Sequence, residues 1–433
     1  MRRHRSFQIS SLSKWKEALL EWSKSNSIIA WMDSNDHQDK YSSYDCILAI
    51  SEQTDKSKKT LKSTDDVQNF IDKEKDWLFG YFSYDLKNEI EELESNNFDG
   101  LNFPELFFFQ PDKIILIREG KIDFLYLKEF EAEIEKDFGK IAALSDTTNP
   151  RFGEPQSIRI KMRIHKDAYF EKAHNFLAHI HRGDIYEANF CQEFYAQNTT
   201  IDPLETYKNL NRISKPPFAS YLRIDDKFLL CASPERYLKK QGPTIISQPI
   251  KGTAARGENT LQDEKLKQQL GQDEKERAEN IMITDLVRND LSKSALKGSV
   301  EVDELCKVYS FNQVHQMIST VKAKVSGSKK PLELIKETFP MGSMTGAPKI
   351  SAMKIIEELE ETKRGLYSGT VGYFDPAGNF DFNVVIRSIL YNDSHKYVSF
   401  SVGSAITSRS VPENEYQECL LKAKAMRSVL EGT

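Results

Sequence analysis

Hydrophobic and polar positions alternate along this chain in two different rhythms. Between Ser13 and Ser25 the apolar residues Trp15, Leu19 and Trp22 return on one face, which predicts an amphipathic helix. Short continuous apolar runs follow, and runs of this kind predict buried strands. These runs are Trp77–Phe82, Leu106–Phe109 and Lys113–Ile117.

Longer helical patterns occupy the second half of the chain. Residues 264–292 predict a long charged helical region with a break at Gly271. The last segment begins at Pro412, carries acidic residues in its first turn and ends near Gly432, so a capped terminal helix is expected. The acidic stretch Glu89–Glu94 predicts a solvated helix face.

Paired strand patterns separate these helices. The runs Tyr367–Phe374 and Phe380–Tyr391 flank the turn residues 375–378 and predict a β-hairpin, and Lys396–Ile406 predicts a further strand. Strands and helices do not alternate singly. The chain is therefore expected to be α+β with antiparallel sheets rather than doubly wound.

A polar stretch from Ser145 to Pro155 holds two prolines and a glycine and interrupts every regular pattern. It predicts a boundary between an amino-terminal region, residues 1–150, and a second domain, residues 155–433.

Composition narrows the class of protein. The 433 residues are 39% hydrophobic and 29% charged, with a formal net charge of −5, which argues against nucleic acid or an anionic membrane as the main partner. The five cysteines form no Cys-x-x-Cys pair, which favours a reducing compartment. No apolar run reaches the length of a membrane span, and no apolar core follows the basic start Met1–Arg5. A cytoplasmic protein is expected.

Two pairs of glutamates stand out on the predicted helices. Glu276 and Glu279 lie three residues apart, as do Glu415 and Glu418, so each pair projects from one helix face. Two such helices can present four hard oxygen ligands to one Mg²⁺ ion. The alternative is that both pairs are solvated and that Glu418 forms an ordinary surface ion pair with Lys422.

A glycine-rich stretch, Met341–Lys349, precedes an apolar helical pattern. Backbone N–H groups at a helix start can bind an anion, but Pro348 before the lysine departs from the nucleotide-binding P-loop. A tight turn without a ligand fits the same residues.

Four single residues have a chemical and a structural interpretation. Arg387 closes a β-forming run, where it either binds a carboxylate or lies on the surface. His315 has no metal-ligand partner nearby in sequence, so a hydrogen-bonded structural histidine is its default interpretation. Glu235 is a general acid, a helix cap or a surface charge. Lys251 is a nucleophile only if its surroundings lower its pKa; otherwise it is a solvated charge.

Taken together, these motifs resemble the chorismate-utilising enzymes, which include the component I subunits of anthranilate and aminodeoxychorismate synthases and the isochorismate and salicylate synthases. The resemblance covers essentially residues 160–430, and more loosely Gly80–Asp85. It implies a two-lobed α+β fold, in which antiparallel sheets form a β-sandwich core with helices outside. The matching stretches are Gly183–Tyr186, Ser233–Glu235, Pro249–Gly257, Asp285–Asp290, Gly342–Lys349, Tyr367–Phe374, Ile386–Ser388 and Glu415–Lys422.

The resemblance implies a role for each candidate residue. By this resemblance, the direct ligands of the Mg²⁺ ion would be Glu279 and Glu418, and Glu276 and Glu415 would hold its waters. The catalytic residues would be Lys251, Glu235 as general acid for the departing C4 hydroxyl, and His315. The substrate-binding residues would be Ser343, Tyr367, Arg387, Gly403 and Lys422.

The choice of product depends on Lys251. In the resembling family, anthranilate synthases typically carry alanine in this motif, whereas aminodeoxychorismate synthases carry a lysine that attacks C2 of the ring. The resemblance therefore favours 4-amino-4-deoxychorismate, a precursor of 4-aminobenzoate and folate. Anthranilate synthase component I and a non-catalytic chorismate-binding regulatory protein are the alternatives. The attack requires a neutral amine, so burial is expected to lower the pKa of Lys251.

Two further expectations follow from the resemblance. Isochorismate-forming members use lysine after Tyr186 and amine-transferring members usually have glutamine; this chain has Glu187, which argues against isochorismate formation. No segment before Thr433 resembles a glutaminase, so ammonia is expected from a separate glutamine amidotransferase subunit. Residues 28–34 only loosely resemble the tryptophan-binding motif of the family, and tryptophan inhibition is not expected.

Overall fold

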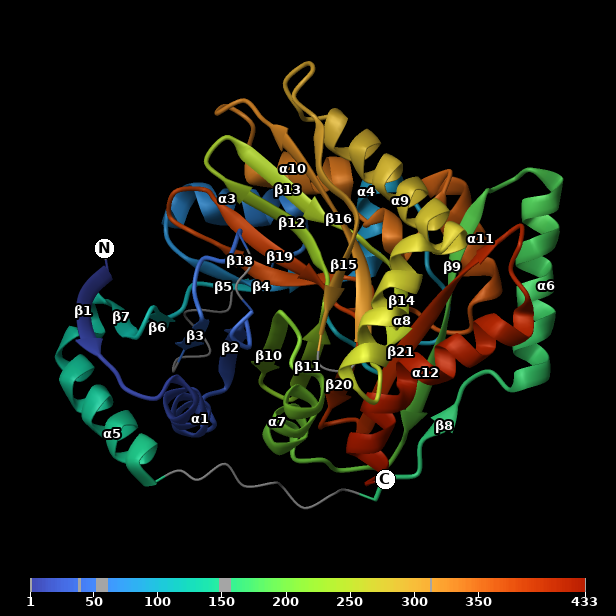
Figure 1. Cartoon of the computed structure of the whole chain (residues 1–433). Helices are drawn as coiled ribbons and strands as arrows, with labels where there is room; N and C mark the ends of the chain where they lie inside the picture. The colour runs from blue at the N-terminus through green and yellow to red at the C-terminus, as the bar shows by residue number, and fades with distance from the viewer. Residues whose placement is uncertain (1, 38–39, 52–60, 148–156, 312–313, 433) are drawn as a thin grey trace.

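Two antiparallel sheets, packed face to face with helices outside them, form the body of the molecule in the computed structural model (Figure 1). The structure describes residues 2–37, 40–51, 61–147, 157–311 and 314–432. This arrangement confirms the predicted α+β class and its two-sheet core. The predicted boundary at residues 145–155 falls mainly outside the described ranges.

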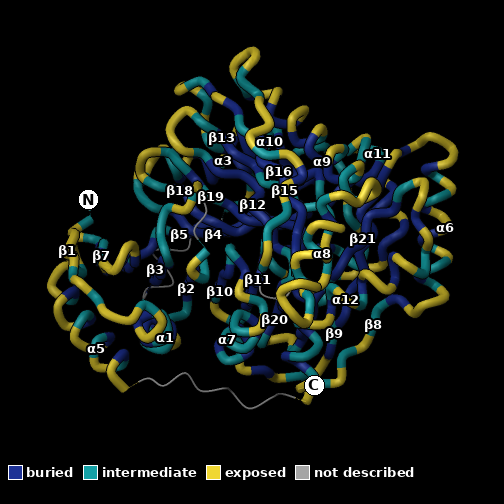
Figure 2. The backbone as a smooth tube through the Cα atoms, viewed as in Figure 1, coloured by how far each residue is buried: buried dark blue, intermediate teal, exposed yellow. Residues whose placement is uncertain are grey.

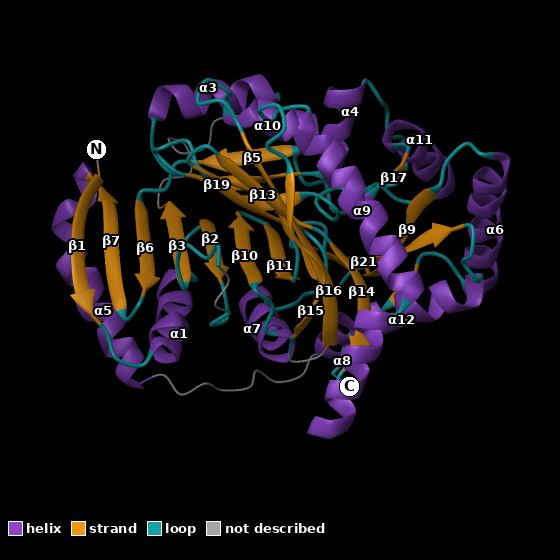
Figure 3. Ribbon diagram, turned by 45° about the horizontal axis from the view of Figure 1, so that its top comes forward, coloured by secondary structure: helices purple, strands orange, loops and turns teal. Residues whose placement is uncertain are grey.

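The larger sheet has twelve strands among the described residues, and Figure 3 shows many of them side by side. In spatial order they are β1 (Arg2–Gln8), β7 (Lys121–Leu127), β6 (Lys113–Arg118), β3 (Cys46–Ser51), β2 (Ile28–Asp33), β10 (Phe218–Ile224), β11 (Lys227–Ser233), β20 (Ser388–Asn392), β21 (Tyr397–Thr407), β9 (Glu187–Ala196) and β17 (Gly346–Ala347), with β8 (Lys161–Met162) also paired to β9.

The smaller sheet has nine strands among the described residues. In spatial order they are β14 (Ile250–Ala255), β16 (Val314–Lys324), β13 (Thr244–Gln248), β12 (Arg236–Gln241), β19 (Phe380–Val384), β18 (Thr370–Phe374), β4 (Leu78–Phe82) and β5 (Leu106–Phe109), with β15 (Glu301–Ser310) also paired to β16.

Helices cover the outer faces of both sheets. The core on the outer side of the larger sheet includes apolar residues of α1, α5, α6, α7, α11 and α12, whereas α3, α9 and α10 pack on the second core. Their bounds are α1 (Leu12–Ser23), α3 (Thr64–Glu74), α4 (Lys87–Glu91), α5 (Ile134–Thr147), α6 (Lys166–Arg182), α7 (Pro203–Ser214), α8 (Thr260–Gln272), α9 (Glu274–Ser292), α10 (Pro331–Thr338), α11 (Lys349–Leu359) and α12 (Pro412–Glu431).

Strand β2 explains why some apolar runs are continuous rather than alternating. Its Ile29 and Trp31 belong to the core under the helices, whereas Ile28, Ala30 and Met32 belong to the core shared with the smaller sheet. Side chains of a strand point to opposite faces in turn, so a strand covered on both faces is apolar throughout. Figure 2 shows the buried backbone concentrated in the middle of the molecule.

Both sheets combine strands from early and late parts of the chain. In the larger sheet β2 pairs with β10, and in the smaller sheet β4 pairs with β18. The division into residues 1–150 and 155–433 stays a prediction about the chain, and the two regions complete each other's sheets.

Most predicted elements appear close to their expected positions, and two differ in detail. The charged helical region is interrupted at Asp273 rather than Gly271, because the Asp273 side chain accepts a hydrogen bond from the Glu276 N–H and caps α9. The run Phe380–Tyr391 is not one strand. It leaves the smaller sheet after β19 and enters the larger sheet at β20, with Arg387 between them at φ 53°.

Two features of the structure bear on expectations drawn from the composition: the state of the cysteines and the character of the helices. The five cysteines are all buried and free. Within the described ranges, no helix is both long enough and apolar enough to cross a membrane.

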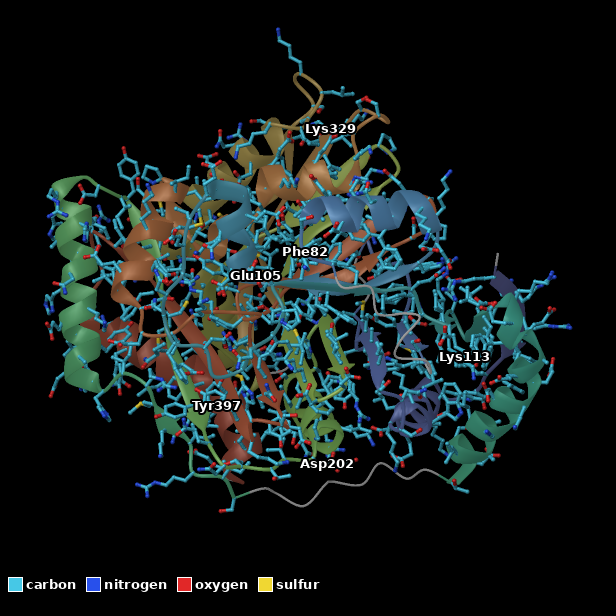
Figure 4. All side chains as sticks on the ribbon, turned by 180° about the vertical axis from the view of Figure 1, so that it is seen from behind. Phe82, Glu105, Lys113, Asp202, Lys329 and Tyr397 are labelled. Atoms are coloured by element: carbon cyan, nitrogen blue, oxygen red, sulfur yellow. The ribbon has the colours of Figure 1, made fainter. Side chains whose placement is uncertain are left out.

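Strand β4, whose Phe82 is labelled in Figure 4, lies between β5 and β18. At its centre Gly80 faces Gly372 of β18. A Cβ atom on Gly80 would stand 1.9 Å from the carbonyl oxygen of Phe107, closer than any real contact. The close approach of these strands therefore depends on glycine at this position.

We expect Gly80→Ala to lower the free energy of unfolding by about 3 kcal/mol, because the methyl group collides with backbone that has no room to move. Chemical denaturation measures the change. Gly139→Ala is the control: this glycine is exposed in α5 with nothing near its added Cβ, so the free energy should rise by about 0.5–1 kcal/mol. Equal stability of the Gly80 variant and the native protein would contradict the packing argument.

Candidate active site

Lys251 stands where the two sheets meet. It lies on β14, an end strand of the smaller sheet, and its Nζ donates a hydrogen bond to Oε1 of Glu187 on β9 of the larger sheet, at 3.2 Å. The same nitrogen is 3.7 Å from Oε2 of Glu279 on α9. Only 18% of the Lys251 side chain is exposed, so this lysine is not the fully solvated charge of the alternative interpretation, and its catalytic role stays a prediction.

The expected pKa of Lys251 is wrong for this arrangement. Burial alone would lower the pKa, but the carboxylates of Glu187, Glu279 and Glu418 outweigh it and raise the pKa above the ordinary value. The amine is therefore an ammonium ion here. Sequence reasoning counted the effect of burial and expected nearby cations; it did not count the carboxylates.

The two predicted glutamate pairs face each other across the site. Glu276 and Glu279 project from the first turns of α9, and Glu415 and Glu418 from α12. The Nζ of Lys275 lies 3.8 Å from Oε1 of Glu279 and 3.8 Å from Oε1 of Glu415, so one ammonium bridges the two helices.

Gly252 leaves space for the Glu276 side chain. It has φ 101°, a backbone conformation that favours glycine, and a Cβ atom there would stand 3.1 Å from Oε2 of Glu276. The glycine after Lys251 thus allows the α9 carboxylate to lie directly over strand β14.

Ser404 and Lys422 hold the α12 carboxylates. The Ser404 hydroxyl lies within hydrogen-bond distance of Glu415 and of Glu418, the latter at 3.1 Å. Lys422 Nζ lies 2.6 Å from Oε1 of Glu418 and donates to the carbonyl oxygen of Gly403 at 2.8 Å. Although burial opposes it, the Lys422 ammonium lowers the pKa of Glu418 to about 2.

The pKa values of the α9 carboxylates shift in the opposite direction, upward. Burial raises the pKa of Glu276, and repulsion from Glu279 and Glu418 adds to it; burial also raises the pKa of Glu279, against the attraction of Lys251. Negative charge at this point is therefore incompletely balanced by the protein.

The donor set fits a hard divalent cation by its chemistry. Two helices that share Lys275 carry the four carboxylates, and Mg²⁺ takes oxygen ligands of this kind, some of them through water. As the side chains lie, no group of three acidic, histidine or cysteine residues in the described part of the chain is arranged to chelate a metal. Lys251 and Lys275 supply the positive charge instead.

Glu235 and Ser343 form a second cluster. Glu235, just before β12, is 4% exposed and accepts a hydrogen bond from the Ser343 hydroxyl at 2.6 Å. Burial raises the pKa of Glu235 to about 7, with Ser343, Lys251 and Lys422 opposing the shift. A carboxyl group of this kind is protonated below neutral pH, as a general acid must be.

The glycine-rich stretch forms a tight turn next to Glu235. Residues 342–344 make a single turn, and Gly346 and Ala347 pair with the start of β9. Lys349 does not face the turn as a free cation, because its Nζ bonds to Asp290 at 2.6 Å.

Arg387 lies in the crossover between the sheets, near enough to Tyr367 and Glu418 for both to act on its charge. Arg387 lies in a pocket with Pro234 and Gln316, and among the described residues its guanidinium has neither a hydrogen bond nor an ion pair. Burial lowers the pKa of this guanidinium. The Tyr367 hydroxyl lies 3.8 Å from Sγ of Cys191 on β9. A partly buried arginine without a hydrogen bond or ion pair to the described residues is suited to an anionic ligand.

His315 is enclosed by protein groups on β16. It is fully buried on β16, with Nδ1 2.9 Å from the Ser310 hydroxyl and Nε2 3.0 Å from Oδ1 of Asp263. Both ring nitrogens thus have protein partners, as its structural interpretation expects. A catalytic role for His315 stays a prediction.

Several residues at the site were missed by sequence reasoning. Lys275 had a signal, because it lies four residues before Glu279 on the same helix. Ser404 had none, since only strand pairing brings it beside α12. Arg364 was also missed. It is buried, and it donates hydrogen bonds to the carbonyl oxygens of Met344 and Asn189 and to the carboxylate of Glu360. It thereby ties the glycine-rich turn to β9.

Comparison with known proteins gives consistent matches. The sequence profile of the family described as chorismate binding enzyme matches residues 25–428. An "anthranilate synthase component I-like protein" of Synechocystis sp. is 36% identical over 82% of this chain and 73% of its own length. "Aminodeoxychorismate synthase component 1" of Bacillus subtilis is 30% identical over 81% of this chain and 76% of its own length.

A solved structure shows the same fold. The crystal structure of anthranilate synthase component I from Streptococcus pneumoniae superimposes with a TM-score of 0.72, covering 98% of this chain and 92% of that chain at 23% sequence identity.

The raised pKa of Glu235 predicts a pH-dependent stability. The group carries no penalty below its unfolded value of 4.5, and the cost of a buried carboxylate grows as pH rises to the folded value of about 7. Glu235→Gln should therefore be more stable than the native protein at pH 8, and this advantage should shrink by about 2 kcal/mol at about pH 5. Denaturation of both proteins at the two pH values measures it. An advantage that does not change with pH would show that Glu235 is not titrating in this range.

Proposed function

Since this chain belongs to the family of chorismate-binding enzymes, we propose that it is component I of an aminodeoxychorismate synthase. The reaction takes chorismate and ammonia to 4-amino-4-deoxychorismate and water. One observation carries the choice: an amine, Lys251, stands at the carboxylate cluster, within 3.7 Å of Glu279. The proposed route to the 4-amino product requires a nucleophilic amine at this position.

Chorismate is a dianion, and the site offers separate partners for its two carboxylates. Arg387 is partly buried and has no hydrogen bond or ion pair with the described residues, so it is suited to bind one of them, with Tyr367 nearby. Glu279 and Glu418, with Glu276 and Glu415, are the residues that would hold Mg²⁺, which when bound supplies Lewis-acid polarisation of the ring carboxylate.

Lys251 and Glu235 share the bond-breaking step. After losing a proton, the Lys251 amine forms a bond to C2 of the ring while the C4–O bond breaks. Glu235 donates its proton to the departing oxygen, so that water leaves. Ammonia then bonds to C4, the bond from C2 to Lys251 breaks, and the lysine is regenerated. Because Lys251 is an ammonium in the structure, its deprotonation is a necessary step.

The ammonia would come from a partner subunit. A relative named as component 1 supports a two-component enzyme, and we propose a separate glutamine amidotransferase as the partner. Five buried, free cysteines support a reducing compartment, the cytoplasm.

Anthranilate synthase component I is the second candidate, because a relative named after it is 36% identical to this chain. The two reactions use the same substrates. They differ in the carbon that receives nitrogen, and anthranilate formation also releases the side chain as pyruvate. Lys251 is the feature that favours the 4-amino product.

Product analysis tests the proposal. With chorismate, Mg²⁺ and ammonium we expect aminodeoxychorismate, converted to 4-aminobenzoate when the corresponding lyase is added. Lys251→Ala should lower the rate of this product by about 100-fold or more, because the covalent step is lost. Anthranilate as the main product would refute the proposed reaction. Mg²⁺-dependent chorismate binding without turnover would indicate a regulatory protein.

The metal assignment has its own test. Glu279→Gln should raise the Mg²⁺ concentration needed for half-maximal activity by about 10- to 100-fold, and calorimetry should show the matching loss of Mg²⁺ affinity. Glu274→Gln is the control, because Glu274 is an exposed residue of the same helix. An unchanged Mg²⁺ titration of the Glu279 variant would remove this carboxylate from the metal site.

A further inference from the structure

The strand that carries Lys251 is irregular at this residue. Strands β14 and β16 pair at Ile250 and again from Thr253 onward, and their register shifts between these two points. In the shifted stretch two residues, Lys251 and Gly252, lie opposite a single residue, Met317. This is the arrangement of a β-bulge, which bends a strand and redirects its side chains. The shape of the bulge therefore sets the direction in which the Lys251 side chain leaves the sheet.

An asparagine of α9 fills this bulge. Asn280 is 1% exposed, and its Nδ2 donates hydrogen bonds to the carbonyl oxygen of Lys251 at 3.0 Å and to that of Met317 at 3.1 Å. An asparagine side chain has two N–H donors, and these two contacts account for both. Buried backbone carbonyls outside a regular ladder need donors, and one amide supplies them to both strands of the bulge.

The amide of Asn280 has one favourable orientation. The buried Ser319 hydroxyl oxygen accepts a hydrogen bond from the N–H of Cys306 at 2.9 Å, so its own proton is donated to Oδ1 of Asn280. If the amide were turned over, Oδ1 would face two carbonyl oxygens that have no proton to give. The amide nitrogen must therefore face the bulge.

The residue before Asn280 contacts the other end of the same lysine. Oε2 of Glu279 lies 3.7 Å from Lys251 Nζ. Two consecutive residues of α9 thus contact the backbone and the amine of Lys251. The helix is itself anchored, because Ile283 and Val287 are buried on its inner side. A rigid element therefore holds both ends of the lysine at a fixed separation.

We propose that Asn280 is a positioning residue for Lys251: its amide holds the bulge of β14 in the shape that directs the lysine side chain to the carboxylates of α9. Its donors and its acceptor are engaged with protein groups, so it acts on the reaction through Lys251 and not through contact with the substrate. Loss of the amide would release the bulge, and the Lys251 nitrogen would no longer lie at one fixed place. The inference rests on the proposed function in that Lys251 carries a step of the reaction.

Kinetics of two variants of Asn280 test this assignment. Asn280→Ala should lower kcat by about 30-fold while KM for chorismate stays within about threefold, because a small displacement of a reacting group slows the chemical step more than it weakens binding. Asn280→Asp keeps the shape but presents lone pairs to two carbonyl oxygens, so it should lose at least as much.

Asn392→Ala is the matched control for lost stability. Asn392 is equally buried, and its Nδ2 donates to the carbonyl oxygen of Leu101 at 2.7 Å. It lies at the end of β20 remote from Arg387. This variant should have a lowered thermal midpoint, as Asn280→Ala should, but kcat and KM should stay within about twofold of the native values.

The other kinetic outcomes overturn the assignment. They are a native kcat in Asn280→Ala or Asn280→Asp, a loss that lies in KM alone, and an equal fall of kcat in the Asn392 control. Anthranilate from the native enzyme would refute the proposed product, and the same comparison of kcat values would still decide the role of Asn280. Full activity of Lys251→Ala would overturn both proposals.

Hydrogen exchange checks the bulge without turnover. In Asn280→Ala the backbone amides of residues 250–255 should exchange about tenfold faster than in the native protein, whereas those of residues 283–291 in α9 should change by less than about twofold. Asn392→Ala should leave both segments unchanged. Unchanged exchange in residues 250–255, or a larger increase in α9 than in β14, would overturn the proposal even if the native enzyme forms the 4-amino product.

Discussion

Repulsion among carboxylates governs the site and much of what surrounds it. Glu276 and Glu279 face Glu415 and Glu418 from a second helix, at a place where burial weakens screening by water. Three lysines are engaged with this charge: Lys251, Lys275 and Lys422 each lie within 4 Å of at least one of these glutamates. Binding of substrate and metal can therefore be understood as a redistribution of partners among fixed negative groups.

Strands near the sheet edges and the buried Arg364 hold the charged groups of the site in place. Lys251 and Glu187 are brought together because β14 and β9 lie near the ends of two different sheets. Arg364 connects the turn that carries Ser343 to β9 through the carbonyl oxygens of Met344 and Asn189. The general acid and the lysine are thus supported by one continuous hydrogen-bonded framework, which limits their relative movement.

Much of this could be read from the chain, for identifiable reasons. Apolar runs and caps are local, so β5, β6 and α12 were predicted within a residue or two. The motifs drew attention to the four glutamates and Glu235, whose roles stay predictions. The features that were not predicted depend on residues distant in sequence. The charge state of Lys251 depends on three carboxylates distant in sequence, and the turn at Arg387 arises because adjacent strands enter different sheets. No sequence pattern signals that Ser404 lies beside α12.

The interleaving of early and late strands bears on how the protein is made. Strand β4 is completed on one side only by β18, and β2 only by β10, so neither sheet can close until most of the chain has left the ribosome. Until then apolar strand edges are exposed, and contacts between distant segments form slowly. The nascent chain is thus a natural client for chaperones, and truncation from either end should trap it in an aggregating form rather than yield a smaller folded unit.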